Sequence, residues 1–146
     1  MEIDFALLAD AANVSREGKL NILGAFDRIH GAKFPLTWPR MMLVMRFVAS
    51  AAEYGTEKQL EIVAMDADGK QLTKVQGKLK LPKEAPVRKL KINHVLPMTL
   101  TFASPGEHSI EILINGEPKA SVSLEVVQRE EPKPDGQGEG GQQPVS

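Results

Sequence analysis

The feature that most constrains the fold of this chain is a period of two in its apolar residues. It is clearest in residues 105–127, where isoleucine occupies every second position from 110 to 114. Asn115-Gly116 follows, a pair that favours the type I′ turn of a two-residue β-hairpin, and apolar residues then return at alternate positions. Because successive side chains of a strand point to opposite faces, this segment predicts a hairpin with one apolar face.

The same alternation recurs in short segments along the chain, separated by polar, glycine-bearing or proline-bearing turns. No stretch of ten residues has the 3.6-residue period of an amphipathic helix. Several short strands joined by turns are typical of an all-β sandwich, and we expect an antiparallel one of about seven to nine strands. Residues 40–49 are apolar on both faces, which suits a central strand. The alternating segments are 5–12, 19–28, 40–49, 59–65, 71–81, 88–96 and 105–127.

Residues 5–12, FALLADAA, can be interpreted as a signal peptide, a helix or a strand. Acidic residues at positions 2 and 4 precede the apolar run, where a signal peptide carries basic residues. We therefore expect no signal peptide and a protein of the cytoplasm. Alanine and leucine are good helix formers, but the period of two favours a strand paired with residues 19–28. We expect one apolar face of this strand to carry Ile3, Phe5, Leu7 and Ala9.

The composition bounds the organisation of the chain. Its 146 residues suffice for one domain with a core, and because aromatic residues make up only 5%, that core is expected to be aliphatic. Residues 130–146 are rich in proline, glycine, glutamine and charge, so we expect a domain over 1–129 and a disordered tail over 130–146. The absence of cysteine excludes disulfides and thiolate chemistry. No apolar run is long enough to span a bilayer.

Four stretches together resemble a family of small bacterial proteins of unknown function. They are FALLADAANVSREGKLNILGAFDRI, FPLTWPRMMLVMRF, the DADGK turn and PGEHSIEILING, and the resemblance covers residues 2–127. It implies an immunoglobulin-like β-sandwich and a bacterial source. It implies no activity and no catalytic residues.

Residues 70–91 are the most strongly charged segment, with eight basic residues and a single acid. A basic stripe suits an acidic partner or nucleic acid, whereas lysines on a solvated face prevent sheets from pairing edge to edge. We do not expect nucleic acid, because no aromatic residue lies between the lysines to stack on bases. The acidic segment 107–139 could meet the stripe in a homo-oligomer, or cover it within one chain. The candidate binding residues of the stripe are Lys74, Lys78 and Lys80.

A second candidate site is the predicted loop at 27–40, DRIHGAKFPLTWPR, which holds the single tryptophan. Binding residues occur disproportionately on loops, and tryptophan and arginine are common interface anchors. The opposing interpretation is that the tryptophan covers one end of the core. The candidate residues of this loop are Arg28, His30, Trp38 and Arg40.

The sequence contains no motif that specifies a reaction. Its three histidines have none of the spacings of metal sites. DADG at 66–69 lacks the further acidic ligands of a calcium loop and predicts a turn. No nucleophile elbow, phosphate-binding glycine loop or nucleotide fingerprint occurs, so we expect no catalytic residue, metal or cofactor. His108 stands where tyrosine is usual at a strand entry, from which it could bond back to the backbone.

From these features we expect a non-enzymatic protein-interaction or scaffold module of the bacterial cytoplasm, with an unknown protein partner and no membrane contact. One alternative is a sandwich that binds a polar ligand or a glycan through Trp38 and its loop. A polar pocket at Trp38 would favour this alternative, and a fully buried Trp38 would oppose it. A further alternative is an enzyme, which would require histidines and carboxylates to gather in the folded chain.

Overall fold

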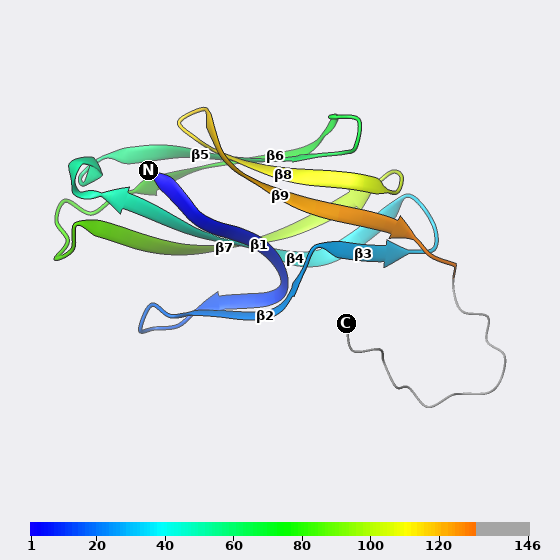
Figure 1. Cartoon of the computed structure of the whole chain (residues 1–146), viewed down its shortest axis with the longest axis horizontal. Coiled ribbons are helices and arrows are strands. Elements are labelled where there is room, and N and C mark those ends of the chain that lie inside the picture. Colours follow the sequence, from blue (N-terminus) through cyan, green and yellow to red (C-terminus); the bar gives the residue numbers. More distant parts are fainter. Residues whose placement is uncertain (131–146) are drawn as a thin grey trace.

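A computed structural model describes residues 1–130, which form nine strands in two facing sheets (Figure 1). The expected immunoglobulin-like β-sandwich is therefore confirmed. One turn of 3-10 helix, Ala51–Glu53, is the only helical element of these residues, and no helix among them is long and apolar enough to cross a membrane. The strands are β1 (Glu2–Val14), β2 (Leu20–Phe26), β3 (Arg28–Gly31), β4 (Leu36–Ser50), β5 (Glu57–Met65), β6 (Gln71–Lys80), β7 (Lys89–Phe102), β8 (Gly106–Ile114) and β9 (Glu117–Gln128).

The two sheets have the strand orders β2-β1-β4-β7 and β3-β9-β8-β5-β6. Neighbouring strands are antiparallel except β3, which lies parallel to β9. The predicted hairpins at 5–28, 59–81 and 105–127 are confirmed as β1–β2, β5–β6 and β8–β9. At the last turn Asn115 and Gly116 both have positive φ, 52° and 78°, as a type I′ turn requires. The predicted tail lies outside the described residues, apart from Glu130.

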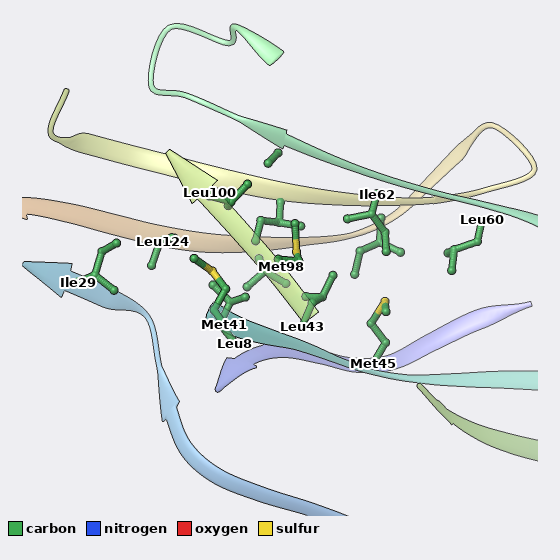
Figure 2. Close-up of a cluster of buried hydrophobic side chains, with 14 of the residues drawn as sticks. Leu8, Ile29, Met41, Leu43, Met45, Leu60, Ile62, Met98, Leu100 and Leu124 are labelled. Carbon is green, nitrogen blue, oxygen red and sulfur yellow. The ribbon is translucent and has the colours of Figure 1, made fainter. Parts of the chain in front are cut away.

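The main core lies between the two sheets and is built mainly from aliphatic residues and methionine, together with Phe47 and Phe102 (Figure 2). On β4 it takes every second side chain, Met41, Leu43, Met45 and Phe47, all fully buried. From the opposite sheet come Ile62 on β5 and the isoleucines of β8. The alternation therefore places one face of each strand toward the other sheet, as the sequence predicts.

A bulge near the start of β1 changes which of its residues share a face. Ile3 lies opposite Phe47, but Phe5 lies opposite Arg46, so the register shifts between them. Ile3 packs against the main core, whereas Phe5 and Leu7 pack on the outer face of the sheet. The prediction that Ile3 shares a face with these residues is wrong, because one extra residue in a bulge reverses the alternation without altering it in the sequence.

A second, smaller core lies on the outer face of the four-stranded sheet. Ala9, Met42 and Val44 are buried there, and Leu20 of β2 packs against them. Figure 1 shows β2 lying outside the sandwich, below β4 and β7. The turn of the β1–β2 hairpin is attached to β7, because the Asn93 side-chain amide donates a hydrogen bond to the Gly18 carbonyl at 3.2 Å. The hairpin covers this face, which explains why β4 is apolar on both sides.

Candidate functional site

The segment predicted as one loop over 27–40 contains two strand segments. Residues 28–31 form β3 beside β9, and β4 begins at Leu36. The loop prediction is wrong here because β3 has only four residues and buries one of them, Ile29. Such a short strand gives no alternating pattern, and its position depends on β9, which is about a hundred residues away along the chain.

The four candidate residues of this segment do not form one site. The Arg28 guanidinium donates to the Glu125 carboxylate at 2.9 and 3.1 Å, and both side chains are exposed. Trp38 is half-buried, lies opposite Leu100 and packs against the main core. His30 and Arg40 are exposed. Within residues 1–130 no hydrogen bond or ion pair joins these four, and Trp38 does not line any of four clefts on this part of the chain.

The lysine stripe is partly neutralised by the neighbouring strand. The Lys74 ammonium lies 3.5 Å from the Glu61 carboxylate, and Lys78 lies 3.5 Å from Glu57. Both acids belong to β5, so antiparallel pairing places them beside lysines that have a single acid in their own segment. Lys80 is exposed and makes no ion pair within residues 1–130. The geometry therefore favours a solvated face over a basic site for an acidic partner.

The largest exposed apolar side chains gather on the β1–β2 hairpin. Leu23 is 72% exposed, Val14 42% and Ile22 38%, and these are three of the five large apolar residues exposed among residues 1–130. Beside them is an open cleft of about 280 Å³, lined on both strands by alanine, asparagine and apolar residues. We call this region the hairpin surface, and its residues are Ala11, Ala12, Asn13, Val14, Asn21, Ile22 and Leu23.

The hairpin surface ends in an unpaired strand edge. β2 pairs with β1 along one side and is the last strand of its sheet. Its seven residues, LNILGAF, include no charge, although exposed edges in natural proteins usually carry lysine, proline or other devices against pairing. One irregularity is present at Gly24, where φ is +69°. The edge therefore leaves backbone donors and acceptors open to another strand.

Sequence reasoning missed the hairpin surface, although one signal for it was visible. In β2 the alternation assigns Leu20, Ile22 and Phe26 to one face, so Leu23 is the only large apolar residue of the other phase. A lone leucine in the polar phase of a strand marks exposure only if that strand is an edge. The position of β2 depends on the hairpin folding under the sheet, which no local pattern specifies.

A smaller cleft lies between the sheets at their open side, between β6 and β7. It holds about 150 Å³, and no charged residue lines it. Burial lowers the pKa of His94, the one titratable residue there. Gly77 contributes to the opening, because a side chain at this position would meet nothing within 4 Å. The lining residues are Leu60, Ile62, Val75, Gln76, Gly77, His94 and Leu96.

His108 is the one buried polar residue of the described chain, and its contacts support the fold. Its Nδ1 lies 3.0 Å from the Gly106 carbonyl, so Nδ1–H donates back to the backbone, as its place at the strand entry suggested. Its ring packs edge-on against Phe102, with centroids 4.9 Å apart. Nε2 has no partner within residues 1–130. Within residues 1–130 as a whole, no three His, Cys, Asp or Glu side chains are arranged to hold a metal ion.

Comparison with known proteins identifies a family and remote likenesses to solved structures, among them two from Pseudomonas. A family model described as a family of unknown function, DUF6941, matches residues 4–127. No curated protein matches the sequence. The chain is similar to the alkylpurine DNA glycosylase AlkC of Pseudomonas fluorescens bound to DNA containing an abasic site analog, with 13% identity and a TM-score of 0.46. The matched region is 86% of this chain and 30% of the glycosylase chain. An immunoglobulin-like protein from Pseudomonas aeruginosa has 18% identity and a TM-score of 0.39, over 86% and 94% of the two chains.

Proposed function

The chain belongs to this family of unknown function, DUF6941, and we propose that its domain is a non-enzymatic protein-interaction module that binds through the hairpin surface. The observation that carries the proposal is the coincidence of exposed apolar side chains with an uncharged, unpaired strand edge on β2. We place the module in the bacterial cytoplasm, and this part of the proposal rests on the sequence and its family resemblance.

Strand addition to β2 is the mode of binding that these features support. An extended segment beside an open edge gains backbone hydrogen bonds along its length, and pockets for alternate side chains add specificity. The exposed Leu23 and the cleft beside it supply such a contact on one face of β2. The lysine stripe and the Trp38 segment offer weaker support for binding, because ion pairs and core contacts already occupy several of their residues.

Photocrosslinking in cells tests the proposal. A photoreactive amino acid replaces Leu23 in one variant and Val87 in a control variant, since Val87 is also an exposed apolar residue but lies in the loop between β6 and β7. We expect a discrete adduct from position 23 and none of the same mass from position 87. Adding Ile22→Lys to the position-23 variant should remove the adduct while thermal unfolding shows that the domain still folds. The proposal fails if position 23 gives no adduct, or the same adducts as position 87.

A further inference from the structure

Resting on the proposed function, we propose that the partner at β2 is a second copy of this chain, whose β2 pairs antiparallel with the first about a two-fold axis at Leu23. Such an interface is isologous, so the surface must be complementary to itself. The exposed face of β2 has this property. The two four-stranded sheets then join into one continuous sheet through the paired edges.

The charges at the two ends of β2 support this arrangement. Lys19 precedes the strand and Asp27 follows it, and both are exposed. Within residues 1–130 neither side chain makes an ion pair. With Leu23 opposite Leu23 of the second copy, each Lys19 lies opposite an Asp27, because both are four residues from the axis. Opposite charges directly across an antiparallel pair are favourable, and like charges are not.

The residues between these charges are also compatible with the pairing. Asn21, Leu23 and Ala25 are exposed and occupy alternate positions of β2, and the two charged residues flank the strand. The two Leu23 side chains meet at the axis, and each covers the other. Leu23 is the most exposed large apolar residue of the described chain. On the other face Ile22 lies opposite Gly24 of the second copy, the one irregular position of the strand. The Asp10 side chain of that copy lies over this glycine and would have to turn aside to admit Ile22.

The size of the contact indicates a weak dimer. One pair of seven-residue strands buries less than the roughly 1,200 Å² typical of stable interfaces, so we expect association in the micromolar to millimolar range. Sedimentation from about 10 μM to about 1 mM should therefore show the monomer converting to dimer.

Cysteine crosslinking tests the register, because the chain contains no cysteine of its own. Directly opposite residues of an antiparallel pair have Cα atoms about 4.5–5.5 Å apart, within the range of a disulfide. Leu23→Cys should therefore form a disulfide-linked dimer under mild oxidation. Asn21→Cys is the matched control, since the proposed register leaves its two copies about 14 Å apart along the strands. We expect the Leu23→Cys dimer to form at least about tenfold faster than the Asn21→Cys dimer.

Charge reversal tests the ends of the pairing. In the dimer, Lys19→Asp places the introduced aspartate opposite Asp27 at both ends of the paired strands. The repulsion between these like charges should weaken association about tenfold. Lys19→Asp combined with Asp27→Lys restores opposite charges between the copies, and should restore association. A general effect on folding would not be reversed in this way.

The outcomes separate this inference from the proposed function. A chain that stays monomeric at about 1 mM, with no Leu23→Cys dimer, overturns the second copy as partner. If position 23 still crosslinks to a different protein in cells, the proposed function stands without the dimer. A dimer that is indifferent to charge reversal, or that forms equally through Asn21→Cys, also overturns the inference, because it uses another surface or register. The absence of any contact at position 23 overturns both proposals.

Discussion

Two glycines in strands differ in what the structure requires of them, and their substitution by alanine should have opposite effects. Gly24 in β2 has φ +69°, and an added Cβ would lie 2.5 Å from the Asp10 carboxylate oxygen. Gly77 in β6 has no positive φ, and an added Cβ would meet nothing within 4 Å. Only the first position therefore needs glycine for a structural reason.

The magnitudes follow from these two environments. A side chain in the left-handed region costs about 1–2 kcal/mol, and the contact with Asp10 adds to it, although a carboxylate on an exposed side chain can move. We expect Gly24→Ala to lower the free energy of unfolding by about 2 kcal/mol. Gly77→Ala should raise it by about 0.4–1 kcal/mol, since alanine reduces the entropy of the unfolded chain without strain in the folded one.

Denaturant unfolding of both variants beside the parent protein measures these changes, with the slope of the transition as a check on two-state behaviour. Asp10→Ala combined with Gly24→Ala separates the two contributions, because it removes the close contact and leaves the backbone strain. Equal effects at the two glycines would refute the reasoning. So would a Gly24→Ala variant that is as stable as the parent.

Three further predictions concern the cleft and the second core. Burial lowers the pKa of His94, so the unfolded chain takes up this proton at a higher pH, and stability should be full above about 6.5 and fall as the pH drops below it. His94→Leu should flatten that decline in unfolding curves, and unchanged slopes would count against it. Val44→Ala should cost about 2 kcal/mol because Val44 is fully buried under the hairpin, whereas Val75→Ala on the partly exposed β6 should cost well under half of that. Asn93→Ala removes two hydrogen bonds, the one donated to the Gly18 carbonyl and the one that its Oδ1 accepts from Arg46 Nε at 2.8 Å. Because only the first involves a backbone group, hydrogen exchange should speed up in the turn at 15–19 without equal loss elsewhere, and a uniform change would contradict this.

The alternation of apolar residues predicts the strands well because each sheet buries the face that it turns toward the other sheet. It predicts β8 and β9 almost residue by residue, and their turn follows from the preference of Asn115-Gly116 for positive φ. It predicts less where the pattern depends on one extra residue or on a distant neighbour. The bulge between Ile3 and Phe5 and the four-residue β3 are of this kind.

The candidate site was harder to predict than the fold, because exposure and pairing are properties of neighbouring strands. Lys74 and Lys78 are unpaired in their own segment and become paired only when β5 lies beside them. Leu23 is one leucine among many until the sheet order makes β2 an edge. The residues themselves were visible, but their surroundings were set by contacts between segments far apart in the chain.

β1 has neighbours in both cores: Leu8 is buried in the main one and Ala9, the next residue, in the one beneath the hairpin. The hairpin is therefore not an appendage that can shift while the sandwich stays unchanged. Any molecule that binds β2 only when the domain is folded therefore raises the free energy of unfolding of the whole domain. The melting temperature of the entire protein would thus report occupancy of a single strand edge.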